Sequence, residues 1–488
     1  MATREISFKT RVLKGFLWLG TGSFAAQAIS WFSTIFVIRL LRPSDFGLMA
    51  MTVAYTELLT SISLLGMNSS LIQAKKVDEG DMRRIFGFLI LTGLAGFVVS
   101  WFAAPAVAAF FAEKQLVTLV RFLSLNFIIY PFHIIPESLL VREINFKERA
   151  KVQVAVQLAG SALTLFLAIE GMGVWALAIG AIAGGCFRVV GFNLASPGKM
   201  RPDFRFWNSP VFLKYGAGVT GARLIRYLYG KSDSVIIAKF LGKSLLGIYG
   251  IALNLATMPV EKVLPLITQL TFTSYSRIQE DRERIARNLL RTTRIIAMAS
   301  FPLFFGMSVL APAGIPFVLG AKWRAAVVPF QLLCLTVPLK ALAPVLSPAV
   351  YAIGKPGRSL RANIVMNVIM VPAFLLGVRH GIYGICIAWT VVFPIAFAVT
   401  SMMYLKALDI PLADYFREIR FPLFSSAAML AIMRLAGRID AGSHTLFNLA
   451  MTGAAGIFFY AAVVIAFKKE ECQELKKMLD WRTAPKGG

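Results

Sequence analysis

The chain is a succession of long apolar runs, each bounded by charged or turn-forming residues. The hydrocarbon core of a bilayer is about 30 Å thick, so one helix crosses it with about 20 apolar residues. About fourteen runs reach this length. They are 16–38, 46–72, 86–111, 118–140, 152–169, 174–195, 211–238, 247–270, 292–311, 326–351, 362–377, 382–404, 421–436 and 446–467. We therefore expect an all-α polytopic membrane protein with about 14 transmembrane helices.

Composition excludes a water-soluble protein, because 57% of the residues are hydrophobic, 16% are charged and the mean hydropathy is +0.69. The net charge of +26 raises nucleic acid as a partner. However, the Lys and Arg residues are dispersed over many short loops, which argues against nucleic-acid binding. These residues show a roughly threefold bias to one side, which places both termini in the cytoplasm.

When the sequence is compared with itself at an offset of 200 residues, similar residues coincide at several positions, which indicates a parallel repeat. The matched pairs are Leu13 with Leu213, Lys14 with Lys214, Arg39 with Lys239, Leu41 with Leu241, Ser44 with Ser244 and Gly47 with Gly247. Chance matches in an apolar background are the alternative. The register predicts two parallel six-helix bundles, 1–205 and 206–405. Residues 406–488 then form helices 13 and 14 and a cytoplasmic tail.

The seventh predicted span places Arg223, Arg226, Gly230 and Asp233 on one helical face. A charge at mid-membrane costs at least about 2.5 to 3.5 kcal/mol, so this face should meet a wet cavity or a neutralising helix partner. Both interpretations stay open. A cationic cavity selects an anionic ligand, and the guanidinium fork suits phosphate. Arg223 and Arg226 are therefore the candidate ligands for an anionic substrate.

Further polar residues lie in the first, second, seventh and eighth spans, which lead the two predicted bundles. The candidates for the cavity wall are Gln27, Glu57, Asp233, Glu261 and Lys262. Among them the three carboxylates could accept a coupling ion, either a proton or a sodium ion. They could equally be counter-charges for the arginines.

Other patterns point away from cofactors and metals. The GAGVTG stretch at 216–221 matches a dinucleotide-binding pattern, but no strand precedes it. The chain has no P-loop and no HExxH motif, so we expect no cofactor, no metal and no built-in ATP motor. The three histidines, His133, His380 and His444, are far apart and are interpreted as structural or surface residues.

Small residues and prolines within the spans have structural and functional interpretations. Gly180 and Gly184 have the spacing of close helix packing. Many prolines interrupt the spans, among them Pro131, Pro136 and Pro302. They indicate either ordinary membrane-helix packing or the bending segments of a transporter.

Three segments resemble a known family. They are RLLRPSDFGLMAM (39–51), GMNSSLIQ (66–73) and GAKWRAAVVPFQLL (320–333). The chain resembles the polysaccharide-transport branch of the multidrug, oligosaccharidyl-lipid and polysaccharide exporter superfamily, which includes O-antigen and colanic-acid exporters. The resemblance implies two six-helix bundles around a central cavity and a lipid-linked oligosaccharide moved from the inner to the outer leaflet. It also implies an undecaprenyl diphosphate carrier, an ion gradient or membrane potential as the drive, and cavity arginines that bind the diphosphate.

We therefore expect a flippase of a polyprenyl-diphosphate-linked oligosaccharide in the bacterial inner membrane, active in surface polysaccharide biosynthesis and not an enzyme. Polysaccharide polymerase machinery is a further expected partner. One alternative is a multidrug-type small-molecule antiporter of the same fold. Another is a membrane glycan polymerase or ligase, which generally needs a larger outward-facing loop than the turns of this chain provide.

Overall fold

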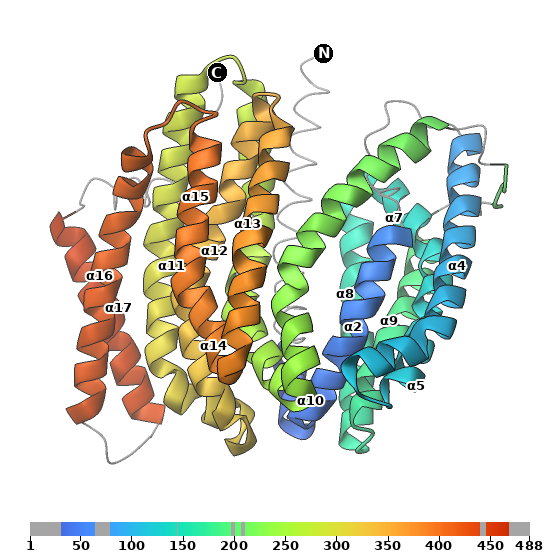
Figure 1. Ribbon diagram of the computed structural model, residues 1–488, viewed down its shortest axis with the longest axis horizontal. Coiled ribbons are helices and arrows are strands. Elements are labelled where there is room, and N and C mark those ends of the chain that lie inside the picture. The colour runs from blue at the N-terminus through green and yellow to red at the C-terminus, as the bar shows by residue number, and fades with distance from the viewer. Residues whose placement is uncertain are drawn as a thin grey trace. The chain divides into compact units, whose positions relative to one another are not determined.

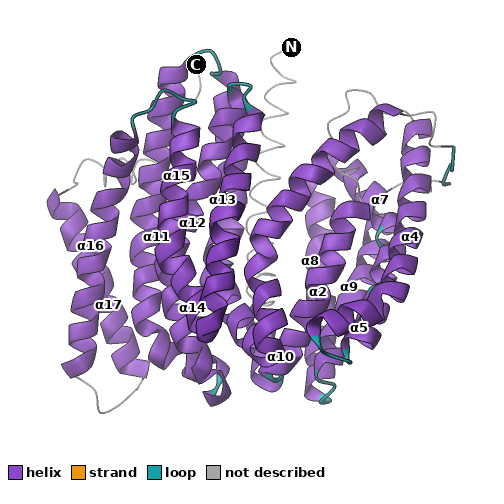
Figure 2. Ribbon diagram, viewed as in Figure 1, coloured by secondary structure: helices purple, strands orange, loops and turns teal. Residues whose placement is uncertain are grey.

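The computed structural model describes residues 31–63, 79–143, 145–196, 201–205, 210–439 and 446–467. The regular elements in these ranges are all helices, and no strand occurs among them (Figure 2). Backbone contacts divide the chain into two compact units, Met1–Gly247 and Ile248–Gly488. The predicted all-α class is confirmed.

The first unit is built from helices that lie side by side (Figure 1). In chain order it contains the helix Trp31–Leu40, α2 (Pro43–Ser63), α4 (Glu79–Phe111), α5 (Leu116–Leu123), α6 (Leu125–Ile129), α7 (Pro131–Arg142), α8 (Phe146–Ile169) and α9 (Val174–Ala195). The next helix, α10, covers Pro210–Arg277 and includes the boundary between the units. Gly242 breaks it with φ +80° and ψ −179°, within the turn predicted between the seventh and eighth spans.

The second unit is also helical. After α10 it contains α11 (Arg282–Leu319), the 3-10 helix η2 (Ala321–Ala326), α12 (Val327–Ala352), α13 (Pro356–Gly377), the 3-10 helix η3 (Val378–His380), α14 (Gly381–Ile387), the π-helix η4 (Ala388–Val392), α15 (Phe393–Leu405), α16 (Leu412–Ile439) and α17 (Leu446–Phe467). The predicted division at 205/206 and 405/406 stays a prediction.

Many of these helices are long and apolar enough to cross a membrane. The described residues contain eight, or nine if Leu116–Ile129 and Pro131–Arg142, which meet at 45°, form one bent span. The predicted number of 14 is not settled by this count. Part of the first predicted span lies outside the described residues, and Pro356–Leu405 joins two predicted spans into one.

The predicted 200-residue register has a counterpart in the packing of the first unit. A Cβ added to Gly47 would overlap the carbonyl oxygen of Lys243, and one added to Gly247 would overlap that of Pro43. The two contacted residues, Pro43 and Lys243, are themselves 200 residues apart. The two contacts are therefore equivalent under the 200-residue register. This reciprocal contact supports the register at this turn, where two backbones approach because neither glycine has a side chain.

Prolines inside helices leave the carbonyl oxygen four residues earlier without its helical N–H donor. At Pro105, Pro136, Pro302 and Pro312 a side chain from another helix donates to that oxygen instead. The pairs are Arg121 Nε to the Trp101 carbonyl (3.3 Å), Asn193 Nδ2 to that of Phe132 (2.9 Å), Tyr460 OH to that of Met298 (3.0 Å) and Gln331 Nε2 to that of Ser308 (3.0 Å). Interhelical packing therefore holds these four positions, which favours the structural interpretation of these prolines.

The two glycines of the small-residue pair on α9 have different surroundings. A Cβ on Gly180 would overlap the hydroxyl of Thr164 on α8, so this glycine lies in a close helix contact. Gly184 has no atom within 4 Å of an added Cβ. Close packing is therefore confirmed for Gly180 and is wrong for Gly184.

Candidate functional site

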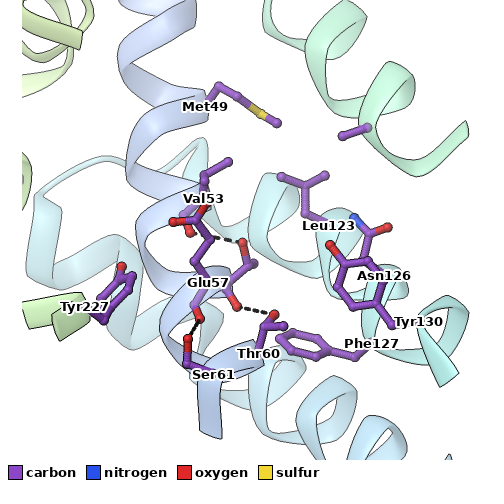
Figure 3. A pocket seen from close by; sticks show the side chains of 12 residues that line it. Met49, Val53, Glu57, Thr60, Ser61, Leu123, Asn126, Phe127, Tyr130 and Tyr227 are labelled. Carbon is purple, nitrogen blue, oxygen red and sulfur yellow. Dashed lines mark hydrogen bonds between the residues drawn. The ribbon is translucent and has the colours of Figure 1, made fainter. Parts of the chain in front are cut away.

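The first unit encloses a cavity of about 320 Å³ among its helices (Figure 3). Its wall comes from α2, α5, α6 and the residue after it, α9 and α10. The lining residues are Met49, Val53, Thr56, Glu57, Thr60, Ser61, Leu123, Asn126, Phe127, Tyr130, Ala181 and Tyr227. Seven of these twelve side chains carry an oxygen or nitrogen, which is unusual for residues inside membrane-spanning helices.

The polar side of the cavity is built on α2. Thr56 and Thr60 donate their hydroxyl protons to carbonyls one turn earlier, at 3.1 and 2.7 Å. Ser61 donates to the Glu57 carbonyl at 2.9 Å (Figure 3). Such back-bonding satisfies the hydroxyl protons locally and leaves oxygen lone pairs for a ligand or water. Thr52, one turn before Thr56, is fully buried instead.

Glu57 is the charged group of this wall, and its counter-charge is on α10. The Lys231 ammonium lies 3.1 Å from the Glu57 carboxylate, and both side chains are more than a third exposed. This pair favours the counter-charge interpretation of Glu57, with a lysine in place of the predicted arginines. Tyr227, one turn before Lys231, donates its hydroxyl to the Ala54 carbonyl and so connects α10 to α2.

Two wall residues on the side facing Glu57 are not among the predicted site residues. Asn126 and Tyr130 follow the short helix α5 and lie opposite Glu57 across the cavity (Figure 3). A polar residue in an apolar run is the signal that could have identified Asn126.

The other predicted site residues are not brought together in this cavity. Asp233 is 1% exposed, and its carboxylate accepts from the amide of Ser234 at 2.6 Å. Glu261 belongs to the second unit, is exposed and accepts from the Thr257 hydroxyl at 2.9 Å.

Several predicted site residues cannot be placed. Gln27 lies outside the described residues. Arg223, Arg226 and Lys262 are within α10, but their side chains lie outside the described part of the chain.

The second unit holds an intramembrane cation of its own. The Lys340 ammonium on α12 lies 3.2 Å from the centre of the Trp389 ring, and Trp389 Nε1 donates to the Tyr249 hydroxyl at 2.8 Å. Trp389 is part of the π-helix η4, where its carbonyl would accept from residue 394, a proline with no N–H. The Thr336 hydroxyl donates to that carbonyl instead, at 3.1 Å.

Comparison with known proteins agrees with this architecture. The chain is 23% identical over 445 residues to the lipopolysaccharide biosynthesis protein WzxC of Escherichia coli, covering 90% of each chain. It is 25% identical over 311 residues to the succinoglycan biosynthesis transport protein ExoT of Rhizobium meliloti, covering 63% of this chain and 61% of ExoT. Its fold is similar to that of the lipid II flippase MurJ in an inward closed conformation, with a TM-score of 0.73, 15% identity, and 93% and 99% of the two chains covered.

A family model described as polysaccharide biosynthesis protein matches residues 36–328, which is more than half of the chain. The matched region contains α2 and α10, whose side chains form the charged pair of the cavity. This multi-pass membrane protein therefore belongs to the polysaccharide biosynthesis protein family.

Proposed function

We propose that the protein is a flippase that moves a polyprenyl-diphosphate-linked oligosaccharide across the bacterial inner membrane, with both termini in the cytoplasm. The observation that carries the proposal is the polar cavity with the Glu57–Lys231 pair inside a bundle of apolar helices. Charged groups at membrane depth are expensive and mark pathways for polar substrates. The names of the relatives, which concern lipopolysaccharide biosynthesis and succinoglycan transport, supply the substrate class.

The diphosphate is assigned to Arg223 and Arg226, which are three residues apart on α10 and one to two turns before Lys231. Two guanidinium groups one turn apart would bind a diphosphate through charge-assisted, bidentate hydrogen bonds. Lys231 then extends the same helix as a third cation. The surface of the oligosaccharide would meet hydroxyl and amide groups such as Thr60 and Asn126.

The coupling ion, a proton or a sodium ion, is assigned to the carboxylates predicted for this role, but Glu57 is now the weakest candidate among them. Glu57 already neutralises Lys231, so Asp233 and Glu261 are the stronger candidates. Gln27 and Lys262 stay proposed as further polar residues of the transport pathway. An enzyme is disfavoured because the described turns are short, as between α4 and α5 or between α8 and α9. Polymerase machinery remains a proposed partner that would receive the exported unit.

The test is reconstitution of the full chain into liposomes with a fluorescent polyprenyl-diphosphate-linked oligosaccharide. Movement between leaflets is followed by dithionite quenching under an imposed pH or sodium gradient. Arg223→Ala with Arg226→Ala should reduce the flipping rate at least tenfold, since about 1.4 kcal/mol of lost interaction already gives that factor. The matched control is Arg358→Ala with Arg361→Ala, an arginine pair of the same spacing at the start of α13.

Full activity in the Arg223/Arg226 variant would remove the diphosphate assignment. No movement of the probe by the unmodified protein under any gradient, with transport of a lipophilic cation instead, would replace the flippase by a small-molecule antiporter.

A further inference from the structure

Helix α7 begins at a bend that places a buried histidine beside a half-buried glutamate. The helices Leu116–Ile129 and Pro131–Arg142 meet at 45°. Pro136 removes the N–H that would bond the Phe132 carbonyl, and Asn193 of α9 replaces it at 2.9 Å. His133 and Glu137 lie one turn apart on this segment, just after the bend.

The His133 side chain is buried, and its nearest polar neighbour is the Glu137 carboxylate. The residue is 7% exposed, and among the described residues both ring nitrogens lack a partner within hydrogen-bond distance. Its Nδ1 lies 3.7 Å from Oε2 of Glu137, just beyond that distance. A neutral imidazole always carries one N–H, so this arrangement leaves a buried donor unused.

The other carboxylate oxygen of Glu137 is bound from α8. Arg149 donates to Oε1 through Nε at 3.2 Å and Nη2 at 3.0 Å, and Gln153 donates to it at 3.5 Å. Oε1 therefore connects α7 to α8, whereas Oε2 faces the histidine. One carboxylate lies between an imidazole on its own helix and a guanidinium on the next.

The surroundings of the pair are otherwise aromatic and aliphatic. The Tyr130 ring lies 5.6 Å from the His133 ring, and the ring of Phe192 on α9 lies at 6.4 Å. Helix α4 contributes a buried apolar cluster that packs against the adjacent residues of α7. Among the described residues, the titratable and charged groups that lie near His133 are Glu137, Arg149 and Tyr130.

We propose that His133 and Glu137 form a proton-binding site at the bend of the fourth predicted span. A proton from water binds an imidazole nitrogen, and the imidazolium then donates Nδ1–H to Oε2 of Glu137. The carboxylate is shared between two cations, so its bond to Arg149 weakens. Protonation thereby weakens the contact between α7 and α8 and adds a hydrogen bond within α7, between His133 and Glu137. Tyr130, which touches His133 and lines the cavity, connects the two sites.

The first experiment measures the proton itself. The chain has three histidines, so His380→Gln with His444→Gln leaves His133 alone. This variant, with 13C-labelled histidine, is placed in lipid nanodiscs and its imidazole resonance is followed by NMR from pH 5 to 8. The proposal requires this resonance to change with pH as the proton binds. A resonance that does not move across the window would overturn the proposal.

The second experiment measures the response of the bend. Amide hydrogen exchange of residues 125–142 is compared at pH 5.5 and 8 after correction for the intrinsic pH dependence of exchange. A several-fold pH-dependent difference is expected in the unmodified chain and in the control His380→Gln. It should disappear in His133→Gln and in Glu137→Gln. An unchanged difference in both variants would contradict the proposed site.

Use of this proton as the coupling ion rests on the proposed flippase function. The proton site and the flippase function can nevertheless be tested separately. Neither measurement above contains a lipid-linked oligosaccharide. In the liposome assay, His133→Gln should keep gradient-independent movement of the fluorescent probe and lose its acceleration by a pH gradient. Acceleration equal to that of the unmodified chain would exclude His133 from coupling, whereas absence of all movement in the unmodified chain concerns the flippase alone.

Discussion

At the scale of single residues, charged groups within the helices have specific partners on other helices. Glu57 on α2 pairs with Lys231 on α10, and Glu137 on α7 pairs with Arg149 on α8. Lys340 on α12 lies over the ring of Trp389 on η4. These contacts compensate part of the cost of moving a charge out of water, which is why the chain tolerates such residues in apolar runs.

The Glu57–Lys231 pair can be tested by a double-mutant cycle. Glu57→Ala leaves an ammonium unpaired at the cavity and Lys231→Ala leaves a carboxylate, so each single change should destabilise the protein. Because both side chains are more than a third exposed, the coupling energy should be below about 1 kcal/mol. It is measured by denaturant unfolding in detergent.

Transport assays on the same variants separate the two interpretations of Glu57. If Glu57 is only a counter-charge, the double variant Glu57→Ala/Lys231→Ala should recover activity that either single variant loses. Loss of gradient coupling in Glu57→Ala that Lys231→Ala does not restore would instead identify Glu57 as an ion site.

At the scale of helices, α16 and α17 are fixed to α11 by polar contacts. Arg294 of α11 donates two hydrogen bonds to Glu418 of α16, and the Tyr460 hydroxyl of α17 donates to the Met298 carbonyl of α11. That carbonyl is the one freed by Pro302. Helix α17 therefore stabilises the proline position of α11, and the Arg294–Glu418 pair fixes α16 to the same helix.

Tyr460→Phe tests this contact with a minimal change of shape. The Met298 carbonyl would lose its donor, so we expect a loss of unfolding free energy of about 0.6 to 1.5 kcal/mol. Thermal unfolding in detergent measures it. Tyr383→Phe, at an exposed position of α14, is the control. Equal stability of the two variants would show that the Tyr460 hydroxyl contributes nothing.

The reciprocal glycine contact makes a second prediction at this scale. In Gly47→Ala the new methyl group would overlap the Lys243 carbonyl, so the two turns must separate, at a cost of about 1 to 3 kcal/mol. Gly184→Ala, where an added Cβ meets no atom within 4 Å, should stabilise α9 by up to about 1 kcal/mol. Denaturant unfolding of both variants distinguishes the two cases. Similar stability of both would contradict the close contact at Gly47.

At the scale of the whole molecule, the basic residues predict the orientation in the membrane. The positive-inside rule places the loop with Lys355, between α12 and α13, in the cytoplasm. It places the turn with Lys114, between α4 and α5, on the opposite side. On this prediction, most of the net charge of +26 is explained by the orientation of the chain.

Cysteine labelling checks this orientation. In a variant without native cysteines, Lys114→Cys should react with a membrane-impermeant maleimide in spheroplasts. Lys355→Cys should react only after permeabilisation. The opposite pattern would invert the topology and place both termini outside.

The sequence alone determined the class, the family resemblance and the candidate turn of the repeat. Long apolar runs predict helices because a chain in lipid must satisfy its backbone hydrogen bonds within each segment. The segment 39–51 contains Gly47, and its match with Gly247 at an offset of 200 residues corresponds to the reciprocal contact in the structure. These features are local, so they can be read from neighbouring residues.

Only the tertiary structure decided which polar groups meet. It paired Glu57 with Lys231, placed Tyr130 and Asn126 opposite them, and brought His133 to Glu137 beside Arg149. These contacts depend on the rotation and tilt of each helix. In a membrane helix the lipid-facing and protein-facing sides are both apolar, so the pattern of apolar residues carries little information about rotation. The partners of each charge therefore became visible only once the helices were packed.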